Sequence, residues 1–422
     1  MSLFSRGNVG FSFSSLFAKL SVFFLLLLSP FFISQESIGI YALFNSWISL
    51  GVIFFYGPFE ALIGREFVNF KNSESNSYYA LKNYVNCVSV FLVAVTVIFY
   101  TFDLLLYDDT IFEFLFLAIL IVGVQKFLVR ELRFADISRA TKVQIFKAAL
   151  LIPVVVLIYY LKSDNPLVVG TLSVTGAMFL YLVYITKQFQ NYFKNFDVQL
   201  FNELLKLYPN RLLGMGLLPF ISILIAKDYS VDELSTFYIA VTIINALSLF
   251  MSSLADKYHQ FVFSGDITSS DHRILIRSAK LLGVIVIIIT GIGTLLIDTV
   301  GNFTSFYKTV LIYLCIGIPY CFHNFIKTLL LAHFLKEPAH SWKFIFSTMI
   351  YSVSFLIGYF LSDSLLIVVL CWSGSRVLGN IYSLYHLNRN KIIVEDYYGD
   401  IKSLLMFANG IFLFSICLFS LI

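Results

Sequence analysis

The chain has 422 residues, of which 59% are apolar and only 13% are charged, and its mean hydropathy is +0.86. No soluble core of this size needs such a balance, so the composition excludes a soluble protein and indicates that the solvent is a lipid bilayer. The net charge of +4 would favour an acidic partner in a soluble protein, whereas here the placement of the charges carries the information.

Apolar segments follow one another along the whole chain. A helix needs about 20 mostly apolar residues to cross roughly 30 Å of hydrocarbon. Thirteen segments come near or exceed that length: 11–34, 38–62, 78–101, 110–129, 140–161, 165–187, 205–227, 232–256, 277–299, 306–334, 341–362, 364–387 and 402–421. The last segment, with Asn409 and Gly410 and little flanking charge, either spans the membrane or lies along its interface. The sequence therefore predicts an all-α integral membrane protein with about 12 to 13 transmembrane helices.

The basic residues predict the orientation. With the N-terminus in the cytoplasm, every Lys and Arg except Lys162, Lys227 and Lys308 falls in a cytoplasmic loop or at the inner end of a helix. The outer joint at residues 103–109 carries three aspartates instead. Because cytoplasmic loops are enriched in Lys and Arg, we expect a multi-pass protein with its N-terminus in the cytoplasm.

The longest polar joints, around 188–203 and 257–273, are cytoplasmic on this orientation, and the outer loops are short. Six apolar segments precede the first joint and six follow it before the last segment. The openings of the second and eighth segments also match, since Glu36 and Tyr41 are each repeated 197 residues later by Glu233 and Tyr238.

This pattern predicts two like-oriented six-helix bundles around a central cavity, as in transporters built from internal repeats. The expected divisions are a bundle at 1–187, a cytoplasmic linker at 188–204, a second bundle at 205–387 and a C-terminal segment at 388–422.

Signatures of enzymes are absent from the sequence. It has no Walker-type glycine-rich loop, no His-Glu-x-x-His and no Gly-x-Ser-x-Gly, and its six histidines do not cluster. We therefore expect a membrane transporter and not an enzyme, with no cofactor and no metal site.

Charges inside apolar segments cost several kcal/mol in lipid unless they face a cavity or a partner. Four cations qualify: Lys19, Arg211, Lys327 and Arg376. The first three are close enough to the cytoplasmic side to snorkel to the headgroups instead. Arg376 has about eleven residues on either side within its segment, which favours a cavity-facing position.

The first and seventh segments each combine an inner cation with a proline further out, Lys19 with Pro30 and Arg211 with Pro219. Interrupted helices at matching positions of two halves are typical of a transport site. A cluster of cations in a low-dielectric cavity suits an anionic ligand, and phosphate is the favoured anion because its oxygens accept charge-assisted hydrogen bonds.

One stretch resembles a known family. Residues 34–43, read as Ser-Gln-Glu-Ser-Ile-Gly-Ile-Tyr-Ala-Leu, together with Gly57-Pro58, Gly64-Arg65-Glu66 and the twelve-helix layout, resemble the polysaccharide-exporter branch of the multidrug, oligosaccharidyl-lipid and polysaccharide exporter (MOP) superfamily. This branch includes bacterial O-antigen flippases. The resemblance implies a V-shaped pair of six-helix bundles that flips an undecaprenyl-pyrophosphate-linked oligosaccharide, an O-antigen or capsule repeat unit, from the cytoplasmic to the periplasmic leaflet.

The resemblance also implies site residues. In similar flippases, basic residues of helices one and seven meet the pyrophosphate in the cavity, and the matching positions here are Lys19 and Arg211. Lys327 and Arg376 rest on the burial argument alone. The expected partners are the lipid-linked oligosaccharide, membrane lipid and the polysaccharide polymerase machinery, with no nucleic acid, and the protein is expected as a monomer in the bacterial inner membrane.

Two alternatives remain open. A cation-coupled multidrug exporter of the same superfamily would need a buried carboxylate in its cavity, for which Glu60 and Asp256 are the only candidates, both at inner helix ends. A membrane-embedded O-antigen polymerase or glycosyltransferase would normally need a substantial external loop, and the sequence has none.

Overall fold

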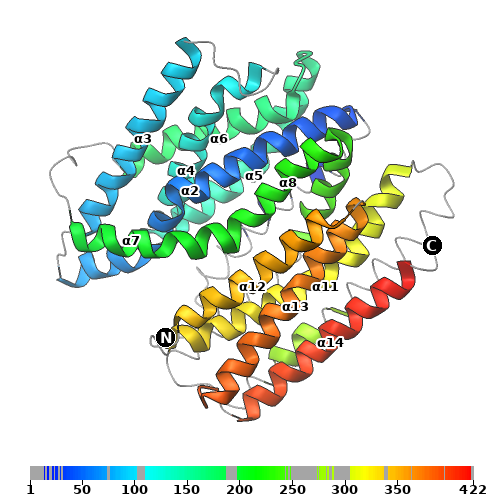
Figure 1. Cartoon of the computed structure of the whole chain (residues 1–422). Coiled ribbons are helices and arrows are strands. Elements are labelled where there is room, and N and C mark those ends of the chain that lie inside the picture. Colours follow the sequence, from blue (N-terminus) through cyan, green and yellow to red (C-terminus); the bar gives the residue numbers. More distant parts are fainter. Residues whose placement is uncertain are drawn as a thin grey trace. The chain divides into compact units, whose positions relative to one another are not determined.

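A computed structural model describes residues 32–73, 77–101, 110–186, 197–242, 305–336, 341–362, 364–393 and 395–419, with scattered residues at 14–29 and 244–288. Its elements are α2 (Gln35–Ser73), α3 (Ser77–Thr101), the 3-10 helix η2 (Thr110–Phe114), α4 (Leu115–Ala135), α5 (Ile137–Tyr160), α6 (Pro166–Thr186), α7 (Val198–Arg211), the π-helical segment η3 (Leu212–Gly216), α8 (Leu217–Asp228), α11 (Ser305–Lys336), α12 (Ser341–Phe360), α13 (Leu365–Arg389) and α14 (Glu395–Phe419). The predicted all-α class is confirmed for these residues (Figure 1).

Eight helices of the described ranges are long and apolar enough to cross a membrane. The chain is therefore a multi-pass membrane protein. One of these spans is Tyr397–Cys417 in α14, so the thirteenth predicted segment is a continuous helix of sufficient length. The total of 12 to 13 stays a prediction, because parts of the segments at 11–34, 232–256 and 277–299 lie outside the described residues.

Several hydroxyl side chains inside the spans donate hydrogen bonds to their own helices. Ser46, Ser89, Thr96 and Ser415 each donate to the carbonyl four residues earlier, at 2.7–2.9 Å. A polar group facing hydrocarbon has no water to bond, so these contacts allow small polar residues within apolar helices.

The first compact unit extends from Met1 to Ser235. Within it α2 packs against α4, α7 and α8, while α6 packs against α4 and α5 (Figure 1). Helix α2 has 39 residues and so is about 58 Å long, which exceeds the roughly 30 Å of hydrocarbon and carries the helix well past the predicted end at residue 62.

The two matching segments of the sequence contact each other in this unit. Gln35 Nε2 donates to the carbonyl of Asp232 at 3.2 Å, and these residues are separated by the same 197 positions as the sequence match. Gly39 comes so close that a Cβ on it would lie 2.1 Å from the carbonyl oxygen of Val231. A side chain larger than hydrogen at position 39 would force these segments apart.

The second compact unit extends from Thr236 to Ile422. Helix α13 packs against both α11 and α12, and α14 packs against α11 (Figure 1). Its core gathers apolar residues around α11, among them Phe322, Phe325, Leu329 and Leu404. Helix α13 therefore contacts α11, α12 and, over a smaller area, α14.

Contacts group α7 and α8 with the first unit, and the second unit begins 31 residues after the predicted start of the second bundle at 205. The predicted linker at 188–204 is helical from Val198, where α7 starts. Asp197 caps α7 by accepting hydrogen bonds from the backbone N–H groups of Gln199 and Leu200 at 3.0 and 3.1 Å. The arrangement of two like-oriented bundles around a cavity stays a prediction.

Candidate functional site

The structure describes the predicted site residues unevenly. Lys19 and Asp256 lie outside the described residues, and for Arg211 only the backbone is described, as the last residue of α7. The π-helical segment η3 follows Arg211 directly, so the predicted helix at 205–227 is interrupted between Pro209 and Pro219. Single π-turns inside helices are frequently found at functional sites.

Arg376 lies in the middle of α13 and is 4% exposed. Its guanidinium carbon is 3.4 Å from the ring centroid of Tyr351 on α12 and 5.4 Å from that of Tyr320 on α11. Nη2 donates to the Tyr320 hydroxyl at 3.3 Å. Contact with ring faces stabilises a desolvated cation by about 2 kcal/mol or more. The buried charge is thus held between two aromatic side chains.

The aromatic enclosure leaves the guanidinium incompletely bonded. Nε of Arg376 is buried and has no hydrogen-bond partner among the residues that the structure describes, and no carboxylate of these residues forms an ion pair with Arg376. Tyr320 is itself held by stacking on Trp372, with ring centroids 4.2 Å apart. The site therefore contains a fixed cation with one donor that no described group accepts.

Hydrogen bonds between helices fix this arrangement. Ser347 on α12 donates to the carbonyl of Gly379 at 2.8 Å, and its hydroxyl also lies 2.8 Å from that of Ser383. Asn380 donates to the carbonyl of His323 on α11 at 2.8 Å. Because these bonds lie within two turns of Arg376, they fix the positions of α11 and α12 along the axis of α13 near this residue.

His323 and Lys327 lie on the part of α11 that faces Arg376, because Asn380, one turn after Arg376 on α13, donates to the His323 carbonyl. Both are on α11, one turn apart, and His323 is fully buried while Lys327 is partly buried. The structure therefore brings together two of the four predicted cations, Lys327 and Arg376. Their role in ligand binding stays a prediction.

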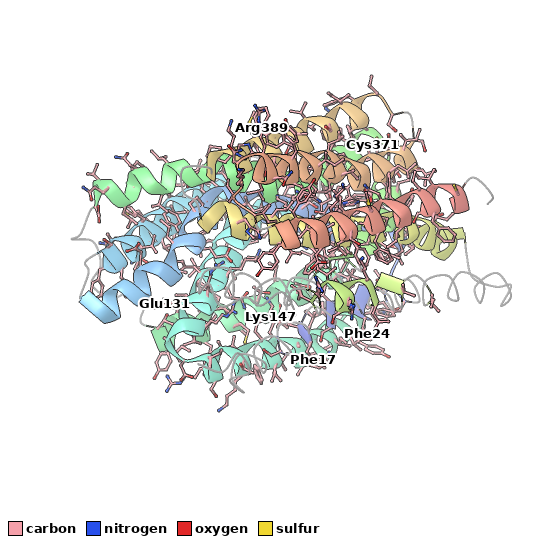
Figure 2. All side chains as sticks on the ribbon, turned by 90° about the horizontal axis from the view of Figure 1, so that it is seen from below. Phe17, Phe24, Glu131, Lys147, Cys371 and Arg389 are labelled. Carbon is pink, nitrogen blue, oxygen red and sulfur yellow. The ribbon has the colours of Figure 1, made fainter. Side chains whose placement is uncertain are left out.

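The first unit contains a buried ion pair that the sequence analysis missed. Lys82 on α3 and Glu131 on α4 approach to 3.1 Å, with side chains 3% and 8% exposed. Tyr78 donates a short hydrogen bond to the same carboxylate oxygen, and the other oxygen, Oε2, has no partner among the described residues. Figure 2 labels Glu131, and also Lys147 of α5, which donates to Gln125 at 3.1 Å.

This finding corrects the expectation that Glu60 and Asp256 are the only candidates for a buried carboxylate. Glu131 is 6% exposed and Glu66 is 3% exposed, whereas Glu60 is partly exposed and bound to Arg130 at 3.3 Å. In the sequence Glu131 stands between Arg130 and Arg133, beyond the end of the predicted segment 110–129, where a charged side chain ordinarily reaches water. A usable signal was Lys82, five residues inside an apolar segment and one turn from Tyr78.

No protein-family model and no curated protein sequence matches this chain. Solved structures do match it over almost its whole length. The lipid II flippase MurJ in an inward closed conformation superposes with a TM-score of 0.66 at 15% identity, covering 97% of this chain and 98% of that chain. An outward-facing multidrug resistance MATE family transporter of the MOP superfamily gives a TM-score of 0.63 at 13% identity, covering 92% and 95%.

The chain has the fold of MOP-superfamily transporters. A third match, the MATE multidrug transporter DinF-BH in complex with R6G, gives the same TM-score of 0.63 and covers 92% of this chain and 96% of that chain. The resemblance of the sequence to this superfamily is confirmed at the level of the fold. Because one fold hosts several functions, the substrate has to be argued from the site.

Proposed function

We propose that this chain is a flippase that moves an undecaprenyl-pyrophosphate-linked oligosaccharide across the bacterial inner membrane by alternating access. The observation that carries the proposal is Arg376, a buried cation with a free Nε donor and no carboxylate partner in the described part of the chain. A buried charge without an opposite charge is costly, and a phosphate oxygen would supply both the charge and the missing acceptor.

Three further cations complete the proposed pyrophosphate site. Lys327 lies near Arg376 on α11, and Lys19 and Arg211 occupy the positions that the resemblance to flippases implies. A pyrophosphate carries several negative charges, so more than one cation is expected to meet it. The fold agrees with this proposal, since a similar structure is that of a lipid II flippase.

The test is to replace Arg376 in the native strain and measure export. Removing one charge-assisted hydrogen bond costs about 1.5–3 kcal/mol, so Arg376→Ala should lower surface polysaccharide by roughly tenfold or more. Arg376→Lys should retain part of it. The matched control is Arg389→Ala, because Arg389 lies on the same helix but is exposed in its last turn.

The lipid fraction of a deletion strain provides the second measurement. Loss of a flippase should leave single lipid-linked repeat units unextended on the cytoplasmic side of the membrane. Normal export by Arg376→Ala at normal protein abundance would contradict the proposed pyrophosphate site. Unchanged lipid-linked units in the deletion strain would contradict the proposed flippase function.

A second candidate function, a cation-coupled multidrug exporter, is favoured by Glu131. Its Oε2 is buried without a partner among the described residues, and a buried carboxylate is the group that such an exporter needs to bind and release a proton. The predicted coupling roles of Glu60 and Asp256 belong to the same candidate. It would be supported if deletion raised drug sensitivity and left the lipid-linked repeat units unchanged.

The proposed orientation places the N-terminus in the cytoplasm, with the protein acting as a monomer beside the polysaccharide polymerase machinery. Reporter fusions at Asp164 and Asp228 should therefore report periplasm, and a fusion at Arg133 should report cytoplasm. Opposite results at two of these three positions would reverse the orientation.

A further inference from the structure

His323 is another polar side chain in the interior of the second unit whose bonding is incomplete. It is 0% exposed, and neither Nδ1 nor Nε2 has a hydrogen-bond partner among the described residues. A neutral imidazole has one donor and one acceptor, and leaving either unbonded in an apolar interior costs about 1–3 kcal/mol. Only the backbone carbonyl of His323 is engaged, by Asn380.

The charged and titratable groups around His323 are cations and phenols. Arg376 is one turn before Asn380, the residue of α13 that bonds the His323 carbonyl. Tyr351 contacts Arg376 from α12, and Tyr320 and Lys327 lie one turn from His323 on α11. Helix α14 meets this level of α11 through Phe407, which contacts Phe322.

The charged residues of the neighbouring elements are engaged elsewhere. Lys402 of α14 lies over Tyr398, and Lys280 donates to Ser403. Asp400 is in the first turns of α14, about two turns before Phe407. Among the described residues, none of the groups at the level of His323 supplies a negative charge that would stabilise an imidazolium beside Arg376.

We propose that His323 binds a proton when a pyrophosphate occupies the Arg376 site, so that anion binding and proton uptake are coupled. The inference rests on the proposed function. An empty site presents His323 only to positive charges, those of Arg376 and Lys327, which favours the neutral ring. A bound pyrophosphate reverses the sign of the local charge, and the imidazole then takes a proton from water and donates it towards the anion.

The coupling has a defined thermodynamic consequence. Since the protein–anion complex holds one proton more than the free protein, its affinity rises as the pH falls, by up to about tenfold per pH unit in the range where the extra proton is bound. Nothing in the sequence alone indicates this role, because a histidine in an apolar segment is ordinarily part of the packed core.

The experiment measures binding of inorganic pyrophosphate to the purified protein in detergent micelles, between about pH 6 and 8 around the usual histidine pKa. Calorimetry in two buffers of different ionisation enthalpy gives the number of protons taken up. Wild type should take up as much as one proton more than His323→Gln, and the protonation of pyrophosphate itself cancels in this difference. His333→Gln is the matched control, because His333 is a buried histidine on the same helix.

A measurement on the wild-type protein alone covers the case in which His323→Gln does not fold. Of the six histidine side-chain NMR signals, one should change from the neutral to the protonated form when pyrophosphate is added at neutral pH. Pyrophosphate binding with equal proton uptake in wild type and His323→Gln, or without a change in any histidine signal, would overturn the inference. Absence of pyrophosphate binding in wild type would instead overturn the anion site on which it rests.

Discussion

The two compact units bury charge in different ways. In the first unit Lys82 meets a carboxylate, Glu131, at 3.1 Å, and the pair is neutral as a whole. In the second unit Arg376 is equally buried but is surrounded by the rings of Tyr351 and Tyr320, with no carboxylate partner in the described residues. Contact with ring faces leaves the net charge of the site positive, whereas an ion pair has no net charge.

This difference separates a structural charge from an available one. An ion pair such as Lys82–Glu131 holds two helices together and leaves little charge for a ligand. The Arg376 enclosure keeps the guanidinium in place without neutralising it, which is the preorganisation that an anion site needs. The comparison predicts that the two sites respond oppositely to substitution: loss of a partner destabilises the first unit most, and loss of the charge affects export most in the second.

The largest change in stability is expected for Glu131→Gln. It removes the carboxylate that approaches Lys82 to 3.1 Å, and losing one partner of a buried ion pair costs about 3–5 kcal/mol. Thermal unfolding of the purified protein in detergent should show the loss. The double variant Lys82→Met/Glu131→Leu should recover most of the stability, because both charges of the pair are replaced by apolar side chains. If Glu131→Gln unfolds like wild type, the ion pair is not a structural element.

A smaller effect is expected in the Arg376 enclosure. A double-mutant cycle between Arg376→Met and Tyr351→Leu should give a coupling energy of about 0.5–2 kcal/mol for the contact between the cation and the ring. Tyr351→Phe keeps the ring face and should retain most of this energy, which makes it the matched control. A coupling energy near zero would mean that the ring only fills space beside Arg376.

The all-α class and the positions of individual helices were predictable from the sequence, and the site only in part. Apolar runs of bilayer length locate helices such as α5 and α13 within a few residues, because every backbone group in a membrane span has to bond within its helix. The burial of Arg376 followed from its depth in one such run. The aromatic partners did not, since Tyr320 and Tyr351 come from other helices and only tertiary packing brings them to α13.

The Lys82–Glu131 pair escaped prediction for a different reason. Glu131 is at the inner end of its apolar run, next to Arg130, where a charged side chain ordinarily reaches water. Its burial depends on α3 and α4 packing together over Tyr78. The position of a charged residue along its helix therefore indicates its depth in the membrane. It does not indicate whether a neighbouring helix covers the side chain.

The smallest effect is expected for the ion pair between Arg130 and Glu60, whose side chains are 38% and 28% exposed. Water screens such a pair, so Arg130→Ala should change stability by only about 0.2–1 kcal/mol in the same unfolding measurement. This places a limit on Glu60 as well. Glu60→Gln should be nearly as stable as wild type. A loss of transport in that variant would therefore be assigned to ion coupling and not to unfolding. A stability loss as large as that of Glu131→Gln would show that exposure does not distinguish the two pairs.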